Sequence, residues 1–170
     1  MSAAAPLAKL SVGVLVERSK GASQWVDYLW RPVGILAGAP ETPAWTKLSD
    51  DGTRAQYYAG ATEVELYRSE TGNYRDNLAS GEPSLWVVLR RVEGDPPFEL
   101  FMVTADPAEG EGMTEAGNDV VEMVPMPPPV QDAIAQFIAE YHVERAFTKR
   151  QRDRAPLEPL ARRAPSTERR

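Results

Sequence analysis

The chain has 170 residues, a formal net charge of −6 and no cysteine, which fits one domain with a single core and excludes disulfides, thiolate metal sites and cysteine nucleophiles. Its hydrophobic fraction of 42% and charged fraction of 26% are typical of soluble globular proteins. The N-terminus lacks the basic start and apolar stretch of a signal peptide, and no run of 18 apolar residues occurs, so we expect a cytoplasmic protein that does not span a membrane.

The charge is distributed unevenly along the chain. From residue 143 onward nine Lys and Arg stand against four Asp and Glu, a net +5, whereas the preceding residues carry −11. A basic tail can bind nucleic acid or an acidic partner, or fold back on its own acidic body. The acidic body argues against nucleic-acid binding, which normally needs a basic face on the folded domain. We therefore predict a flexible N-terminus over 1–8, a single α+β domain over 9–147 and a basic, disordered tail over 148–170.

The first part of the chain is dominated by strand patterns. The first strand shows alternating valines, the second is interrupted by Pro32 and is therefore expected to be an edge or bulged strand, and the Asp51-Gly52 pair predicts a hairpin turn. In the fifth, Val64 and Leu66 face the opposite way from two glutamates, so one face of the sheet should be wet. In chain order the predicted strands cover residues 10–18, 28–37, 45–48, 54–59 and 62–68.

The second part mixes strands with helices. A short helix over 70–78 is predicted with Ser69 as its N-cap. The run 84–92 is apolar on both faces and should be a central strand that contains a buried Trp86. The remaining predicted elements are an antiparallel neighbour at 98–104, a helical turn or two within 107–115, a strand at 119–124 and a helix over 127–142.

The last helix has the clearest pattern. Its apolar residues fall at offsets 0, 4, 7, 8 and 11 from Val130, which is one stripe of a helix with 3.6 residues per turn. The whole pattern predicts an α+β fold: a mainly antiparallel sheet with a short middle helix and this amphipathic C-terminal helix packed on it. Whether the sheet is strongly curved or barrel-like is left open by the sequence.

Motifs for catalysis are absent from the sequence. The chain has no G-x-S-x-G, no P-loop and no G-x-G-x-x-G motif. The single histidine, His142, ends the last helix, where its neighbours Glu140 and Glu144 are badly spaced for metal chelation and a helix-capping role is favoured. We therefore expect no catalytic residues, no metal ligands and no cofactor. The absence of these motifs favours a protein that is not an enzyme, without excluding enzymatic activity.

An aromatic group near the N-terminus is the first candidate binding surface. Trp25, Tyr28, Trp30 and Arg31 lie close together in the sequence. Aromatic residues and arginine are enriched in the residues that dominate binding energy at protein interfaces. The alternative is that the tryptophans belong to the core, and for Trp25 and Trp30 the sequence does not decide.

Eight segments together carry a resemblance to a known family. They are VGVLVER (12–18), WRPVGILAGAP (30–40), YYAGATEVELYRSET (57–71), YRDNLAS (74–80), LWVVLRR (85–91), FMVTADP (101–107), VPMP (124–127) and HVERAFTKRQRDR (142–154). They resemble a bacterial family of unknown function that is encoded beside molybdenum-dependent formate dehydrogenase genes, and some of its members are labelled molybdopterin-guanine dinucleotide biosynthesis proteins. The resemblance implies a setting in formate metabolism and carries no known active site.

In this setting the segment after the last helix becomes a second candidate, a docking element for an acidic or phosphate-bearing partner. Its residues are His142, Arg145, Phe147, Lys149 and Arg150. The resemblance implies a non-enzymatic accessory protein for assembly, cofactor delivery or regulation of the dehydrogenase, with a dehydrogenase subunit or a maturation factor as partner. The alternatives are an enzyme that processes molybdopterin nucleotides and a general interaction module that uses its basic tail.

Overall fold

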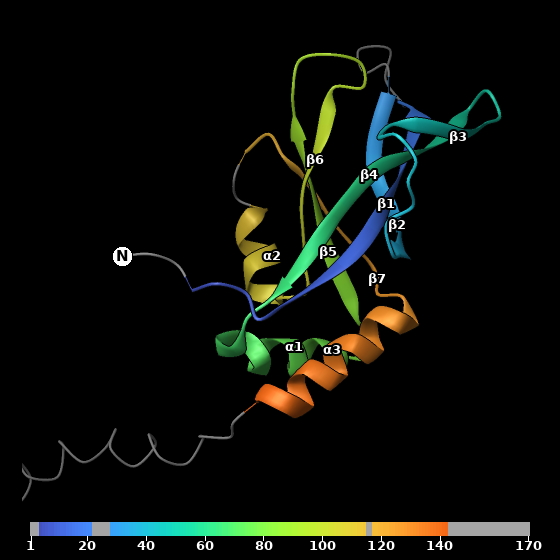
Figure 1. Cartoon of the computed structure of the whole chain (residues 1–170). Helices are drawn as coiled ribbons and strands as arrows, with labels where there is room; N and C mark the ends of the chain where they lie inside the picture. The colour runs from blue at the N-terminus through green and yellow to red at the C-terminus, as the bar shows by residue number, and fades with distance from the viewer. Residues whose placement is uncertain (1–3, 22–27, 115–116, 143–170) are drawn as a thin grey trace, which may run out of the picture.

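The computed structural model describes residues 4–21, 28–114 and 117–142. The described residues form an α+β fold with antiparallel sheets, which confirms the predicted class (Figure 1). Among them no helix has both the length and the apolar character needed to cross a bilayer. The elements are β1 (Ala8–Lys20), β2 (Tyr28–Ala37), β3 (Thr46–Asp50), β4 (Arg54–Leu66), the 3-10 turn η1 (Arg68–Glu70), α1 (Thr71–Leu78), β5 (Ser84–Arg91), β6 (Phe98–Thr104), α2 (Pro107–Met113), β7 (Val120–Pro125) and α3 (Pro128–Tyr141).

The strands form two sheets, with strand orders β2-β1-β4-β3 and β6-β5-β7, in which all neighbours are antiparallel. The sheets approach each other along two seams, β4 beside β6 and β2 beside β7. Within the described residues no hydrogen-bonded ladder joins the sheets at either seam. The barrel-like form left open by the sequence is therefore not a closed barrel.

The first sheet follows the predicted alternation. Val12, Val14 and Val16 are fully buried, and they point to the core between the sheets. β2 lies at the sheet edge, and its register against β1 shifts next to Pro32. Both features suit a proline, which cannot donate a hydrogen bond to a ladder, so the predicted edge or bulged strand is confirmed.

The prediction of two separate strands at 54–59 and 62–68 is wrong, because this stretch forms the single strand β4. The chain passes through Gly60 at a φ of +130°, beside the register shift against β1. Glycine adopts this conformation without the penalty that a side chain would bring. The strand thus continues through a bulge at a place where the sequence pattern predicts the end of one strand and the start of another.

The second sheet is built around β5, whose residues from Ser84 to Leu89 are all buried. α2 covers its outer face. A Cβ atom placed on Gly110 would lie 2.2 Å from Cγ of Trp86, so this helix can approach the indole closely only because the residue is glycine. Trp86 is 6% exposed, which confirms its predicted burial.

The helices α1 and α3 close one end of the sheets. α1 begins at Thr71 with Glu70 as its N-cap residue and no side-chain capping bond, so the predicted cap by Ser69 is wrong; η1 occupies that turn instead. Tyr74 of α1 meets Phe137 of α3 with ring centroids 6.2 Å apart.

Valines, leucines and aromatic residues of both sheets, α1 and α3 belong to one buried cluster. Figure 1 shows the resulting arrangement: the two helices lie at the lower end of the strands, and the turn between β3 and β4 and the loop between β5 and β6 lie at the upper end.

Candidate functional site

The upper end of the two sheets carries an unusual arginine. Arg18 continues the series of core-facing residues in β1, and its register partners are Trp30 of β2 and Ala55 of β4. Because alternate residues of a strand point to the same face, Arg18 lies on the core-facing side of β1, at the end of the core that is closest to solvent. The side chain of Arg18 is only 20% exposed.

Aromatic rings surround the guanidinium group of Arg18. Its central carbon lies 4.3 Å from the ring centroid of Tyr28, 5.6 Å from that of Tyr57 and 5.9 Å from that of Trp30. Nη1 also donates a hydrogen bond of 2.9 Å to the Tyr57 hydroxyl. Ring faces attract cations most strongly where water is partly excluded, so these contacts offset much of the cost of burying the charge.

The rings also connect the two sheets. Trp30 lies 5.5 Å from Tyr57 and 5.9 Å from Trp45 in the first sheet and its loop, and 6.4 Å from Phe98 of β6 in the second. Aromatic pairs at such distances add about 0.5–1.5 kcal/mol each beyond the area they bury. We refer to Arg18, Tyr28, Trp30, Tyr57 and Phe98 as the aromatic–arginine cluster.

Trp45 is held against this cluster in a strained backbone conformation. Its φ of +63° makes it the one residue other than glycine with a positive φ in the described part of the chain. A left-handed conformation costs an L-residue roughly 1–2 kcal/mol. The edge-on contact with Trp30 and a hydrogen bond from the Trp45 amide to the carbonyl of Tyr58 maintain it.

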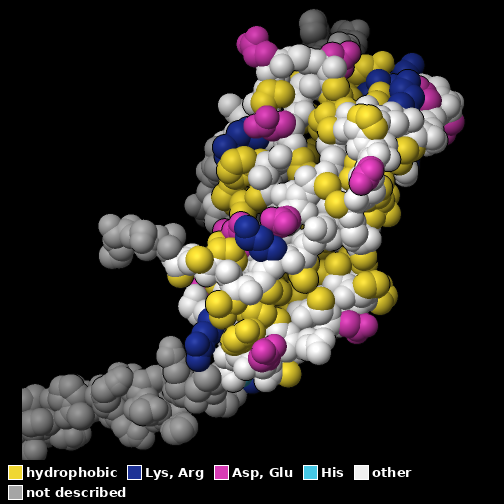
Figure 2. Space-filling view, in the orientation of Figure 1, with side chains coloured by type: hydrophobic (Ala, Val, Ile, Leu, Met, Phe, Trp, Pro, Cys, Tyr) yellow, Lys and Arg dark blue, Asp and Glu magenta, His cyan; other side chains and the backbone are white. Residues whose placement is uncertain are grey.

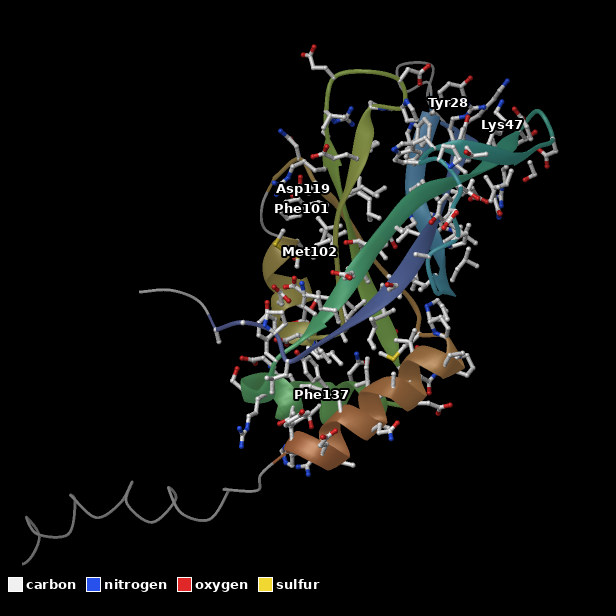
Figure 3. The ribbon with its side chains drawn as sticks, in the orientation of Figure 1. Tyr28, Lys47, Phe101, Met102, Asp119 and Phe137 are labelled. Carbon is white, nitrogen blue, oxygen red and sulfur yellow. The ribbon has the colours of Figure 1, made fainter. Side chains whose placement is uncertain are left out.

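Two cations share one carboxylate beside the cluster. Asp50 accepts a 2.9 Å hydrogen bond from Nζ of Lys47, and Nη2 of Arg18 lies 3.7 Å from the same oxygen. The hydrogen bond from Lys47 is the main cause that holds the pKa of Asp50 below its ordinary value, and it raises the pKa of Lys47. Both shifts favour the charged forms of Lys47 and Asp50. Figure 3 shows Lys47 and Tyr28 at this end.

A cavity of about 320 Å³ opens next to the cluster. Its walls come from Tyr28 and Trp30 on one side and from Arg91 and the loop before β6 on the other. The guanidinium of Arg91 lies 4.8 Å from the ring centroid of Phe98. Two arginines therefore flank one group of aromatic rings, an arrangement that suits planar or anionic groups of a partner. Figure 2 shows that Lys and Arg side chains gather at this end together with acidic ones.

The structure brings two members of the predicted aromatic surface together. Tyr28, 43% exposed, and the half-buried Trp30 share a strand face and line the cavity. Arg31 is exposed on the opposite face of β2, opposite Glu17 in the register. Trp25 lies outside the described residues. The sequence left open whether Trp30 belongs to the core or to a binding surface. In the structure it packs against the core and also lines the cavity.

Sequence reasoning missed Arg18, Tyr57 and Arg91. A signal for Arg18 was present, because it stands two residues after Val16 in an alternating series whose other members are buried. No comparable signal marked the other two. They reach the site through the pairing of β4 with β1 and the approach of the second sheet, and neither can be read from the local pattern of one strand.

At the lower end the structure places one residue of the predicted docking segment. His142 follows α3, and its Nδ1 lies 2.9 Å from Oγ1 of Thr71 at the start of α1. The ring thus links two helices. Arg145, Phe147, Lys149 and Arg150 lie outside the described residues. A cavity of about 680 Å³ adjoins His142.

The described residues contain no group of three or more His, Cys, Asp or Glu side chains placed to hold a metal ion. What the upper end offers chemically is recognition: aromatic surface with a fixed orientation, and guanidinium groups whose positions are set by ring contacts and an ion pair. The fold and the site together describe an α+β protein with two antiparallel sheets and the aromatic–arginine cluster at one end.

Residues 11–151 match the family described as "Protein of unknown function (DUF3305)". The match covers most of the chain, and the protein belongs to this family. Neither a curated protein nor a solved structure matches the chain. The expected membership in an uncharacterised family is thus confirmed, and the link to formate dehydrogenase stays a prediction.

Proposed function

We propose that this protein is a non-enzymatic accessory protein that binds a partner protein through its upper end. The observation that carries the proposal is the aromatic–arginine cluster. Three aromatic rings surround the guanidinium of Arg18, and one of them, Tyr28, is also exposed to solvent, where a partner could contact it. Interfaces are enriched in tyrosine, tryptophan and arginine at the positions that dominate their binding energy.

The surface is also preorganised for binding. Hydrogen bonds and ring contacts already hold the side chains of Arg18, Trp30 and Trp45 in place. A partner would therefore immobilise few additional rotamers at this surface, which lowers the entropic cost of association. The resemblance to proteins encoded beside molybdenum-dependent formate dehydrogenase supplies the partner we propose, a subunit of that enzyme or one of its maturation factors. The role would be assembly, cofactor delivery or regulation.

The test is co-purification of the tagged full-length protein with formate dehydrogenase from cells grown with formate and molybdate. We expect the wild-type protein to enrich the dehydrogenase or a maturation factor, and Tyr28→Ala to weaken the association at least about tenfold, as for a residue at the centre of an interface. Phe101→Ala is a matched control, since Phe101 is an aromatic residue of similar exposure, 40%, on β6.

Two results would contradict the proposal. The first is the absence of any enrichment together with normal formate dehydrogenase activity in a deletion strain, which would remove the partner. The second is an equal loss of binding in the Tyr28 and Phe101 variants. This result would contradict the proposed binding surface but would leave the proposed partner in place.

The second candidate is an enzyme that processes molybdopterin nucleotides. The cavity beside Tyr28 and Trp30 favours it, because its aromatic walls suit a planar heterocycle, and its lining also holds a cation, Arg91, and a carboxylate, Asp95, that could bind polar groups of the ligand. Titration with GTP and magnesium separates the two candidates: binding at micromolar nucleotide would favour the enzyme, and no binding at millimolar nucleotide would remove it.

A further inference from the structure

The cavity at the lower end is remote from the aromatic–arginine cluster and differs from it in character. Three parts of the chain form it: the segment before β1, the junction of η1 with α1, and the end of α3. Its volume of about 680 Å³ is roughly twice that of the upper cavity. Volumes of about 300–1,000 Å³ are usual for sites that enclose small organic molecules.

The lining combines apolar walls with a few polar groups. Tyr67, Tyr141 and Leu7 contribute rings and an aliphatic side chain. Arg68 and His142 contribute nitrogen atoms, and two hydroxyl-bearing residues, Ser69 and Thr71, also belong to the lining. A mostly apolar concavity with a small number of convergent polar groups is the usual composition of a small-molecule site.

The walls are fixed by interactions between different elements. Thr71 and His142 are joined at 2.9 Å between Oγ1 and Nδ1, which connects the start of α1 to the end of α3. The backbone amide of Tyr67 donates a 2.9 Å hydrogen bond to the hydroxyl of the buried Tyr74. Since these bonds hold the lining, the cavity requires little rearrangement to accept a ligand.

The polar groups favour an anion. Arg68 is exposed at the cavity and always carries its charge. The first turn of α1, at Thr71 and Gly72, adds the partial positive charge of a helix N-terminus. Two acidic side chains are bonded to lining residues, but neither lines the cavity itself. Glu70 accepts hydrogen bonds from Asn73 and Ser69 at 3.2 and 3.1 Å, and Glu65 accepts one of 2.6 Å from the hydroxyl of Tyr67.

We propose that this cavity is a binding site for a small organic anion that carries an aromatic ring. The ring packs against the side chains of Tyr67, Tyr141 and Leu7, and the anionic group lies beside Arg68 and His142. This site is independent of the protein-binding surface proposed above, and either can exist without the other.

Gly72 provides a direct way to fill the cavity. It lines the cavity, and a Cβ atom built on it meets nothing within 4 Å. Gly72→Leu therefore adds an apolar side chain at the cavity wall, where its Cβ meets no clash, and replacing a helical glycine also favours the helix. Gly112→Leu in α2 is the matched control, because Gly112 is likewise helical and its Cβ would also meet nothing within 4 Å.

The probe is 8-anilinonaphthalene-1-sulfonate, an aromatic anion, titrated into the full-length protein while its fluorescence is recorded. We expect saturable binding of one molecule per chain. Gly72→Leu should weaken it at least about tenfold and Gly112→Leu should leave it unchanged. Arg68→Gln should weaken it about three- to tenfold and reduce its dependence on salt. Circular dichroism confirms that each variant is folded.

The uncharged analogue N-phenyl-1-naphthylamine separates an anion site from a merely apolar one. If it binds as tightly as the sulfonate and Arg68→Gln has no effect, the cavity does not select anions and the proposal is overturned. The proposal is also overturned if the sulfonate does not bind or if its binding does not saturate. Equal affinity of the wild type and Gly72→Leu for the sulfonate overturns it as well.

Discussion

At the scale of single residues, Gly110 shows how one missing side chain sets the position of a helix. Its backbone lies against the indole of Trp86, and a Cβ there would come within 2.2–2.6 Å of three ring atoms. Real Cβ contacts do not occur at such distances, and the indole, which β5 carries, is almost fully buried against α2. Glycine has a low helix propensity, but at this position it is a packing requirement of α2.

Gly110→Ala should destabilise the protein by about 1–3 kcal/mol, the usual cost of forcing extra volume into a packed site. Gly112→Ala in the same helix is the control, because its added methyl group meets nothing within 4 Å; it should be neutral or stabilising by up to about 1 kcal/mol. Denaturation in urea measures both. Equal stability of the two variants would contradict the proposed contact between α2 and the indole.

Among the structural elements, the hairpin of β3 and β4 depends on two aspartates. The side chain of Asp51 accepts 2.8 Å hydrogen bonds from the backbone amides of Thr53 and Arg54. Asp50 accepts one from the amide of Gly52, besides that from Lys47. These bonds favour the ionised carboxylates and lower the pKa of both aspartates below 3.8, the backbone amides being the main cause for Asp51 and Lys47 for Asp50.

This hairpin should therefore weaken in acid. A carboxyl group whose pKa is lowered by folding stabilises the folded state above its unfolded pKa, about 3.8 here, and the contribution is lost as the pH falls through the lower folded value. Hydrogen exchange of the β3 and β4 amides should accelerate relative to β5 between pH 4 and pH 2. In Asp51→Asn, which keeps an acceptor oxygen but cannot titrate, the acceleration should be smaller. An unchanged pH profile in that variant would show that Asp51 does not contribute.

The elements also show what the sequence could and could not predict. Alternation and turn chemistry correctly located β1, β2, the hairpin at Asp51-Gly52, the central β5 and the amphipathic α3, because each depends on neighbouring residues. The continuity of β4 through Gly60 was missed, since a bulge depends on the partner strand. At the candidate site Tyr28 and Trp30 were found, whereas Tyr57 and Arg91 depend on register and on the packing of two sheets.

At the scale of the whole molecule, a single core joins the two ends. Buried residues of both sheets, α1 and α3 form one connected cluster, with Val12 and Val87 in the sheets and Ile134 in α3 among its members. Partly buried Trp30 and Trp45 pack on the same cluster at the upper end. A change at the lower end should therefore affect Trp30 and Trp45 at the other end, because a single connected core favours cooperative unfolding.

Phe137→Ala tests this connection. Phe137, labelled in Figure 3, is 5% exposed. Its ring contacts those of Tyr74 and Tyr141, so its truncation should cost about 3–5 kcal/mol. Tryptophan fluorescence and far-ultraviolet circular dichroism should give the same urea midpoint in the wild type, and both midpoints should fall together in the variant. Phe101→Ala is the comparison. Phe101 is 40% exposed and lies 3.5 Å from the guanidinium of Arg90, so its truncation should cost only about 1 kcal/mol. A fluorescence midpoint that stays in place while the circular dichroism midpoint falls would show that the upper end unfolds independently, and the aromatic–arginine cluster would then be stabilised by its own contacts alone.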